Sequence, residues 1–408
     1  MVERAARYRE VFAVAEFWAL FAAHLLSVLG DQFARLAVSV LVFVRTDSAG
    51  LTALTYALTF LPDLIGGPLL SGLADRYPRR TVMIVTDLAR AVLVAAMALP
   101  GAPLVALWGL LVGAQLLSSP FNAARAATLP AVLEGDRYRL AVSVSSMAYQ
   151  LALLLGFGAA GVLVAAVNPA SALLIDAATF VVSAALIRFG LAHRPAPSAS
   201  TTTAPVGWTQ AISAGTRLLW DDRRLRALVA LLCLCAWPVA AEGLAVPYAA
   251  DLGAGPAAVG LLLAAAPAGA VVGMLLINRL PPAARLNAMW PLAVASGAVL
   301  IPCVTRPGLL VTVLLWAVSG AAMAYLIPAN AELVHATPDE QRGQVFGLAA
   351  TAMRVSQGLT VLAAGVTADQ LRPPIVVGIA GAIGAALATA GWLADTRVGR
   401  RHRAGRPR

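Results

Sequence analysis

Two apolar runs of membrane length are joined by a short basic turn, and this arrangement limits the possible folds more than any other feature. The first run ends near Gly72 and the second begins at Thr81. The charged residues between them are Asp75, Arg76, Arg79 and Arg80. So short a turn can join only antiparallel helices, and arginine concentrates on the cytoplasmic side of a membrane. The sequence therefore predicts a transmembrane helical hairpin with its turn in the cytoplasm.

The composition extends this prediction to the whole chain. Apolar residues make up 60% of the 408 residues and charged residues only 12%, whereas about a quarter of the residues in soluble proteins are charged. The length allows about twelve spans of about 20 residues each. The apolar runs are continuous rather than alternating, so they favour helices over a membrane barrel. We predict an all-α integral membrane protein of about twelve transmembrane helices, with both termini in the cytoplasm.

A polar interval divides the apolar runs into two sets of six. It contains prolines and a run of serine and threonine, which predicts a flexible linker, and then apolar residues at helical spacing that could form a surface helix. The predicted spans are 17–44, 51–73, 81–99, a fourth that ends near 124, 140–167, 170–189, 225–250, 257–277, 286–305, 309–331, 343–367 and 375–395. The predicted domains are two six-helix halves at 1–190 and 225–395, the linker at 191–224 and a basic cytoplasmic tail at 396–408. We expect the tail to rest on anionic lipid.

All 30 basic residues are arginine, and the net charge is +10. Most arginines fall in loops assigned to the cytoplasm, so the charge reflects membrane topology rather than nucleic-acid binding. Cys233, Cys235 and Cys303 lie in apolar runs, which predicts inert packing. No Walker-type phosphate loop, H-E-x-x-H motif or C-x-x-C motif occurs in the sequence. We therefore expect no enzymatic activity, no cofactor and no bound metal.

Ionisable side chains in the first predicted span are the leading functional candidates. Asp31 and Arg35 are four residues apart and share a helix face, and His24 lies on nearly the same face. Such residues are costly in a membrane and face a cavity or another polar group. The two residues Asp31 and Arg35 form either a permanent structural pair or a proton-coupling or substrate site. His24 either contributes to that site or is a packed neutral histidine.

Other polar residues interrupt later spans. Glu242 lies at a depth in the seventh span close to that of Asp31 in the first, and no basic residue is near it in sequence. It could bind a proton or a cationic substrate group. Arg354 and Gln357 of the eleventh span could line the same cavity or pair with an acid. In the third span, Asp87 and Arg90 are three residues apart, which predicts a local ion pair that stabilises the helix bundle.

Several motifs resemble those of the major facilitator superfamily. The residues 72–80 resemble its loop signature G-x-L-a-D-R-x-G-R-R, with Pro78 where glycine is usual. A glycine pattern in the fifth span partly resembles the antiporter signature G-P-x-x-G-G, with Phe157 in place of proline; its glycines are Gly156, Gly158 and Gly161. The stretches 26–31 and 119–125 are most similar to the exporter branch that includes bacterial macrolide-efflux and enterobactin-efflux proteins.

The resemblance implies a monomeric secondary transporter in the bacterial inner membrane. It would export a small amphipathic molecule, such as an antibiotic or siderophore, by alternating access and in exchange for protons. The implied cytoplasmic gating loop consists of Gly72, Asp75, Arg76, Arg79 and Arg80, and Arg125 could join it. In this loop Asp75 would bind the positive N-terminal end of the eleventh helix near Gly343. The implied partners are the substrate, protons and the lipid bilayer, without nucleic acid. Two alternatives stay open, namely an importer or facilitator of the same fold and a membrane sensor or scaffold that transports nothing.

Overall fold

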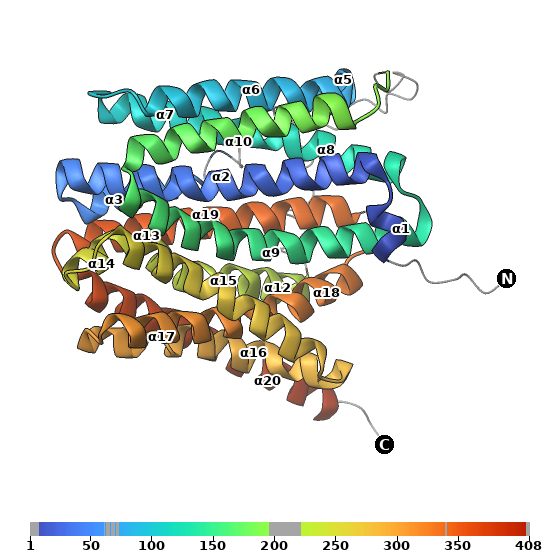
Figure 1. Cartoon of the computed structure of the whole chain (residues 1–408). Helices are drawn as coiled ribbons and strands as arrows, with labels where there is room; N and C mark the ends of the chain where they lie inside the picture. Colours follow the sequence, from blue (N-terminus) through green and yellow to red (C-terminus); the bar gives the residue numbers. More distant parts are fainter. Residues whose placement is uncertain are drawn as a thin grey trace. The chain divides into compact units, whose positions relative to one another are not determined.

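The computed structural model describes residues 8–60, 62, 66, 70, 73–195, 222–338 and 341–404, and Figure 1 shows long helices throughout this part of the chain. In it, 10 helices are long and apolar enough to cross a membrane. They are Ala15–Thr46, Leu104–Val132, Gly135–Ala166, Pro169–Gly190, Arg223–Gly243, Pro256–Asn278, Pro282–Thr305, Leu309–Ala336, Val345–Ala368 and Pro373–Thr396. The prediction of a helical multi-pass membrane protein is therefore confirmed.

Two of the twelve predicted spans are not among these helices. The second, 51–73, falls partly outside the described residues, and helix α3 (Ala49–Ala57) covers its start. The third corresponds to α6 (Arg79–Met97), which is 19 residues long but contains four charged side chains. Such charge is unusual in a membrane helix and requires partners inside the bundle. The number of twelve, like the position of the termini, stays a prediction.

The first of two compact units contains Met1–Asp47, Leu58–Thr202 and Gly255–Ala264. Its helices are α1 (Tyr8–Phe12), α2 (Ala15–Thr46), α5 (Leu73–Arg76), α6, α7 (Leu104–Leu116), α8 (Ser118–Val132), α9 (Gly135–Ala166), α10 (Pro169–Gly190) and the start of α15 (Pro256–Asn278). Helix α2 packs against both α9 and α10, and α10 packs also against α6. The α2–α6–α10 group therefore forms the centre of this unit and holds its buried charged residues.

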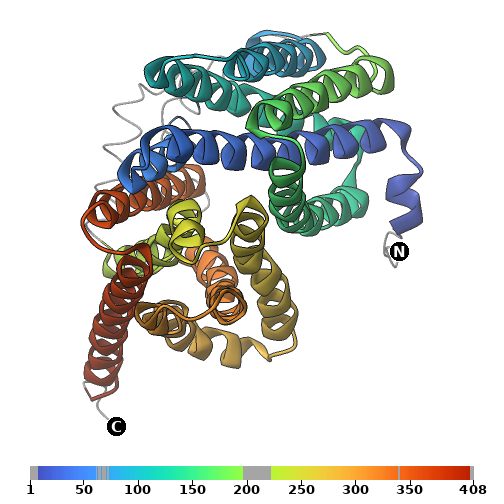
Figure 2. The same cartoon turned by 60° about the vertical axis from the view of Figure 1, so that its left-hand side comes forward.

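The second unit contains Ser48–Ala57, Thr203–Ala254 and Ala265–Arg408. Its helices are α3, α12 (Arg223–Cys233), α13 (Ala236–Gly243), α14 (Ala245–Asp251), the rest of α15, α16 (Pro282–Ala298), η1 (Ile301–Thr305), α17 (Leu309–Ala322), η2 (Met323–Tyr325), α18 (Leu326–Ala336), α19 (Arg342–Ala368) and α20 (Pro373–Ala404). Helix α19 packs against α3 and α13, and α16 lies beside α20 (Figures 1 and 2).

Glycines bring α15 and α17 of the second unit into backbone contact. A Cβ added at Gly269 would meet the carbonyl oxygen of Ala317, and one at Gly320 would meet that of Ala266. A Cβ at Gly273 would lie 2.8 Å from the carbonyl carbon of Ala321. Gly269 and Gly273 have the G-x-x-x-G spacing that allows two membrane helices to approach closely. Sequence analysis did not single out this pair.

The fourth span is longer than the sequence predicted. It was expected to end near residue 124, with Arg125 at the cytoplasmic end, but α8 continues to Val132. The apolar residues after Arg125 continue the helix, and Pro130 is accommodated near its C-terminal end. Arg125 therefore lies inside the helix. The tenth span likewise ends at Ala336 in α18 rather than at 331.

Candidate functional site

An ion pair between α2 and α6 forms the centre of the polar site in the first unit. Arg90 Nη2 lies 2.5 Å from Asp31 Oδ1, and Arg90 Nη1 donates to Ser27 Oγ at 3.0 Å. The guanidinium also lies over the ring of Phe180 from α10, 4.2 Å from its centroid. Only 1% of Arg90 is exposed. An arginine can be buried so deeply because its charge, its two terminal nitrogens and its flat face have partners, although Nε has no hydrogen-bond partner among the described residues.

This pairing corrects two predictions that considered neighbours along a single helix. A permanent pair of Asp31 with Arg35 was one of the two alternatives for these residues, but the ion pair of Asp31 is with Arg90. The guanidinium of Arg35 instead lies 5.9 Å from the ring centroid of Phe60. The predicted local pair of Arg90 with Asp87 is also not formed: the terminal nitrogens of Arg90 bind Asp31 and Ser27, and Asp87 Oδ2 accepts a hydrogen bond from Ser183 Oγ at 2.5 Å. Partners on adjacent helices replace those on the same helix in both cases.

Asp87 and Asp176 are two fully buried acids beside this ion pair. Both residues are 0% exposed. Thr179 Oγ1 donates to the backbone carbonyl oxygen of Asp176 at 2.8 Å and makes a longer contact of 3.3 Å with Asp176 Oδ1. The space in which a Cβ at Gly30 would lie is filled by this carboxylate oxygen and the Thr179 hydroxyl. Glycine at position 30 is thus needed for α10 to place an acid directly against the backbone of α2.

The predicted candidate His24 is also buried in α2. Its ring stacks on that of Tyr149 from α9, with 6.2 Å between the centroids and 10° between the planes. This contact fits a packed histidine, which was one of the two alternatives for this residue. Whether it takes part in coupling stays a prediction.

A second polar site lies in the second unit, where α3 and α13 meet α19. Tyr56 O–H donates to Glu242 Oε2 at 2.7 Å. On α19, Gln357 Nε2 donates to Cys235 Sγ at 3.4 Å, and Arg354 lies half-buried one turn earlier. The structure therefore places Glu242, Gln357 and Arg354 on helices that pack together, as the prediction of a shared cavity requires. No pattern in the sequence pointed to Tyr56, because an aromatic residue in an apolar span is ordinary.

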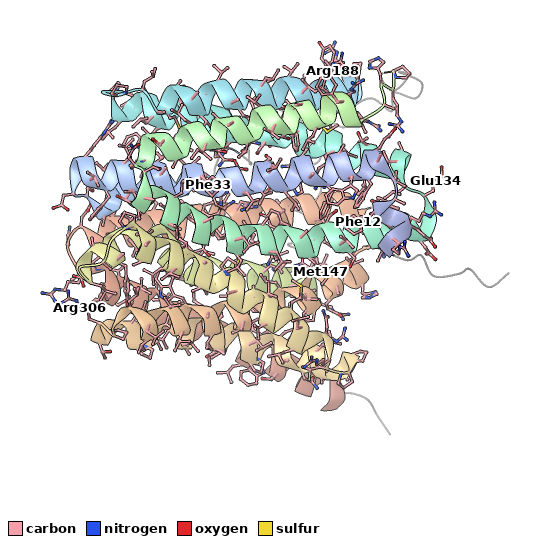
Figure 3. All side chains as sticks on the ribbon, viewed as in Figure 1. Phe12, Phe33, Glu134, Met147, Arg188 and Arg306 are labelled. Carbon is pink, nitrogen blue, oxygen red and sulfur yellow. The ribbon has the colours of Figure 1, made fainter. Side chains whose placement is uncertain are left out.

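The predicted gating loop is only partly described. Gly72 lies outside the described residues, and so does the side chain of Asp75, whose backbone belongs to α5. Arg76 is exposed. Arg79 Nη1 donates to the carbonyl oxygen of Ala127 at 2.6 Å, and Arg80 donates to that of Arg188, which lies at the end of α10 (Figure 3). These arginines thus stabilise carbonyl groups near the C-terminal ends of helices.

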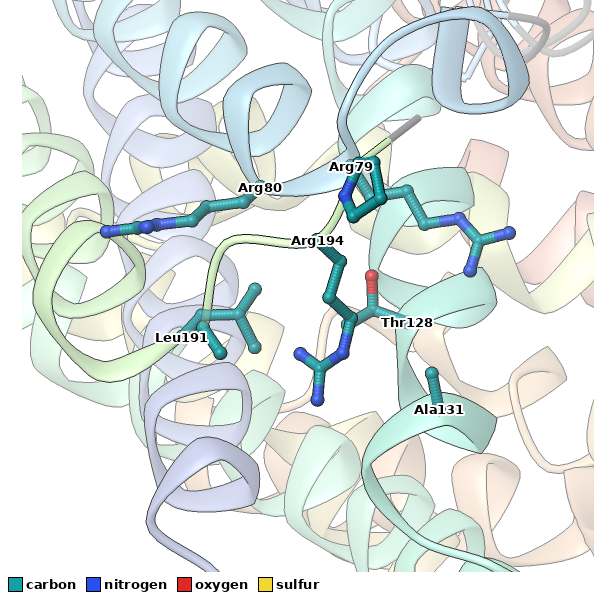
Figure 4. Close-up of a pocket in the computed structure, with 8 residues that line it drawn as sticks. Arg79, Arg80, Thr128, Ala131, Leu191 and Arg194 are labelled. Carbon is teal, nitrogen blue, oxygen red and sulfur yellow. The ribbon is translucent and has the colours of Figure 1, made fainter. Parts of the chain in front are cut away.

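A cavity of about 410 Å³ adjoins these arginines (Figure 4). Its walls include Thr128, Ala131 and Leu191. The guanidinium groups of Arg79 and Arg80 point away from each other in Figure 4, toward α8 and α10. Arg194 also lines the cavity and forms an ion pair with Glu16 at 2.8 Å. The three cations therefore already have partners in the protein, so this cavity is not a ready anion site.

The three glycines of the fifth-span motif have different surroundings. A Cβ at Gly156 would lie 2.8 Å from Gln32 Cγ, and one at Gly161 would lie 2.6 Å from the Cα of Gly260. A Cβ at Gly158 would meet nothing within 4 Å. Gly161 and Gly260 therefore form a backbone crossing between α9 and the first turns of α15, whereas Gly158 takes no part in it.

Replacing Gly161 by alanine should reduce the yield of folded protein and its thermal stability, because overpacking of this kind costs about 1–3 kcal/mol. Gly158→Ala is the matched control and should behave as wild type. The yield and the thermal stability of both variants can be measured by size-exclusion chromatography after heating to increasing temperatures. Equal stability of the two variants would contradict the crossing.

The sequence did not predict a contact in the second unit between the start of α3 and the end of α19. Asp369 Oδ1 accepts hydrogen bonds from the backbone N–H of Gly50 at 2.9 Å and from Ser48 Oγ at 3.1 Å. Ser48 Oγ also accepts from the N–H of Leu51, which makes it an N-terminal cap. A Cβ at Gly50 would collide with the Asp369 carboxylate. An acid at the end of one helix thus binds the positive end of another.

Comparison with known sequences identifies a family over nearly the whole chain. The pattern of the Major Facilitator Superfamily matches residues 20–246 and 243–408. A relative from Bacillus subtilis (strain 168), called uncharacterized MFS-type transporter YfiS, is 31% identical over 171 residues. This match covers 42% of the chain and 41% of the relative, so it spans less than half of the relative's length.

Solved structures agree with this family. A mutant of the nucleoside transporter NupG has a TM-score of 0.76 at 13% identity, covering 93% of this chain and 98% of that one. The peptide transporter POT in complex with sulfate has a TM-score of 0.72 at 16% identity, covering 94% and 95%. At such low identities the likeness establishes the fold alone.

Proposed function

Because the chain belongs to the major facilitator superfamily, we propose that it is a secondary active transporter that works by alternating access. It exports a small amphipathic organic molecule, such as an antibiotic or siderophore, and is driven by protons that enter in exchange. It acts as a monomer in the bacterial inner membrane. Support for the direction comes from the exporter-like stretches 26–31 and 119–125 and from the partial antiporter signature in the fifth span.

The main observation behind proton coupling is the buried charge in the α2–α6–α10 group. Asp31 and Arg90 form an ion pair inside a helix bundle that crosses the membrane, where charged groups are costly. A bundle that served only as a scaffold would be at least as stable with apolar residues there. Ionisable residues at this depth are therefore a sign of ion or proton transfer.

Glu242 is the second candidate for coupling or substrate binding. The Tyr56 hydroxyl donates a hydrogen bond of 2.7 Å to Glu242 Oε2. This donor favours the carboxylate form of Glu242, which can only accept hydrogen bonds. A substrate cation that approaches Glu242 would interact with the phenol ring of Tyr56 as well. The two residues together favour an amphipathic ligand with a basic nitrogen over a sugar or a phosphate.

Gating would take place at both ends of α19. The family resemblance implies that Asp75 would bind the N-terminal end of α19 on the cytoplasmic side and that Arg125 would support that loop. At the other end, Asp369 holds the start of α3 through Ser48 and Gly50. We propose that making and breaking these two contacts accompanies the change of access.

Substrate extrusion from an efflux-deficient bacterial host tests this proposal. Wild type should lower the accumulation of at least one cationic amphipathic dye or antibiotic, and a protonophore should abolish this effect. Glu242→Gln should lose extrusion, and Tyr56→Phe should weaken it by about 10- to 150-fold, since one hydrogen bond to a charged group contributes about 1.5–3 kcal/mol and each 1.4 kcal/mol corresponds to about tenfold.

Asp251→Asn is the matched control, because Asp251 pairs with the partly exposed Arg306 (Figure 3). This variant should extrude the substrate as wild type does. Extrusion that resists the protonophore would exclude proton exchange. Accumulation above that of the empty host would show uptake instead of export.

A further inference from the structure

The α2–α6–α10 group contains more acids than its arginine can neutralise. In the described part of this group, Asp31, Asp87 and Asp176 lie near one buried cation, Arg90. The two terminal nitrogens of Arg90 bond to Asp31 and Ser27. If all three acids were ionised, two negative charges would be left without a cation in a medium of low dielectric constant, at great cost.

The two remaining acids also lack the hydrogen bonds that a buried carboxylate needs. Asp87 accepts one hydrogen bond from Ser183, and Asp176 accepts a long one from Thr179. Among the described residues, Asp87 Oδ1 and Asp176 Oδ2 are buried without any hydrogen-bond partner. Buried carboxylates usually accept two or more hydrogen bonds or pair with a cation. A bound proton would remove both the charge and the need for these donors.

We propose that Asp87 and Asp176 form an internal proton-binding site, and that Asp87 exchanges its proton when Arg90 turns from Asp31 to it. The proposal deepens the proton coupling given above and rests on it only for its role in transport. Asp87 and Arg90 are three residues apart on α6, so their side chains are within reach of each other. The structure shows the arrangement in which Asp31 holds the arginine.

In this exchange the guanidinium of Arg90 moves from Asp31 to Asp87, while a proton moves from Asp87 to Asp31. As the guanidinium leaves Asp31 for Asp87, the O–H bond of the Asp87 carboxyl breaks and its proton passes to the Asp31 carboxylate. The net charge is conserved, because Asp31 becomes protonated as Asp87 becomes a carboxylate. The side chain of Asp31 is 22% exposed and Asp87 is 0% exposed, so Asp31 is the acid from which a proton would leave the buried site. Asp176 keeps its proton throughout.

Among the described residues, few other ionisable groups belong to the helices around the pair. Helix α2 contributes Asp31, His24 and the half-buried Arg35, whose guanidinium lies near Phe60. Helix α6 contributes Arg90, and α8 contributes Arg125, which lies near His24. Helix α7 carries no ionisable side chain, and the nearest one that α9 adds is Tyr149, stacked on His24. The balance of charge at the site is therefore set mainly by Asp31 and Arg90.

Infrared spectroscopy of the full chain in lipid nanodiscs tests the site without any substrate, because protonated carboxyl groups and carboxylates absorb at different frequencies. At neutral pH, Asp87→Asn and Asp176→Asn should each remove the band of one protonated carboxyl. Asp251→Asn is the control and should remove none, since Asp251 is paired with Arg306. Asp31→Asn should also remove one band, because Arg90 then turns to Asp87 and expels its proton.

Variants that keep both acids give a second measurement. Ser183→Ala and Thr179→Val remove the hydroxyl donors and should shift the frequencies of the Asp87 and Asp176 bands without removing them. A spectrum that is unchanged in Asp87→Asn and Asp176→Asn would overturn the proposal. So would bands that depend on sodium rather than on pH, since these would indicate a metal-cation site. A wild type that fails to extrude any compound would contradict the proposed transport but not this result.

Discussion

Replacing Arg90 by alanine is expected to lower the free energy of unfolding by about 3–5 kcal/mol, the usual cost of breaking a buried ion pair. Arg90 is among the largest fully buried side chains in the described part of the chain, so its removal also leaves a cavity beside Phe180. Asp31 would lose its counter-charge. Thermal unfolding in nanodiscs, followed by tryptophan fluorescence, measures the effect.

Arg306→Ala is the matched control for this change. Arg306 also pairs with an aspartate, Asp251, at 2.7 Å, but its side chain is 45% exposed. Pairs exposed in this way contribute about 0–1 kcal/mol. The double variant Arg90→Ala with Asp31→Asn should recover part of the lost stability, because no unpaired charge is then left. Equal effects of Arg90→Ala and Arg306→Ala would show that the buried pair does not stabilise the fold.

Replacing Gly269 by valine should have the second large effect and prevent correct folding of the second unit. Its Cβ would overlap the carbonyl oxygen of Ala317, an atom of the backbone that no change of rotamer can move. Helices α15 and α17 would have to separate, which removes the close packing on which membrane helices depend in place of a hydrophobic driving force. We expect little monodisperse protein after extraction.

Gly109→Val in α7 serves as the control, because a Cβ there would meet nothing within 4 Å. Both substitutions put a β-branched residue into an apolar helix, so they share its small effect on helix propensity. Normal yield and stability of Gly269→Val would mean that α15 and α17 do not pack as described. A low yield of Gly109→Val would indicate that the loss is not specific to the crossing.

The sequence predicted those parts of the structure that depend on local composition. Continuous apolar runs indicated membrane helices, and isolated charges in them indicated polar sites, among them Asp31 and Glu242. It did not predict which groups are partners, because partners such as Arg90 for Asp31 come from other helices. The close crossing at Gly269 was missed for the same reason: small residues are common in all these helices, and only tertiary contacts distinguish one glycine from another.

The end of α8 shows a second limit of sequence reasoning. Arg125 was expected at the cytoplasmic end of the fourth span, but the helix continues to Val132 and contains Arg125. A charged residue in the sequence therefore does not by itself mark the end of a helix. Arg125 is half-buried in the structure, and its exposure depends on neighbouring helices that local composition does not place.

The contact of Asp369 with α3 is expected to depend only weakly on salt. Its donors are the backbone N–H of Gly50 and the Ser48 hydroxyl, rather than a cationic side chain. Dissolved ions weaken attraction between exposed charges, as in the pair of Arg194 with Glu16, but affect short hydrogen bonds to a fixed backbone much less. The hold of α19 on α3 should thus persist at ionic strengths that loosen the ion pairs at the surface.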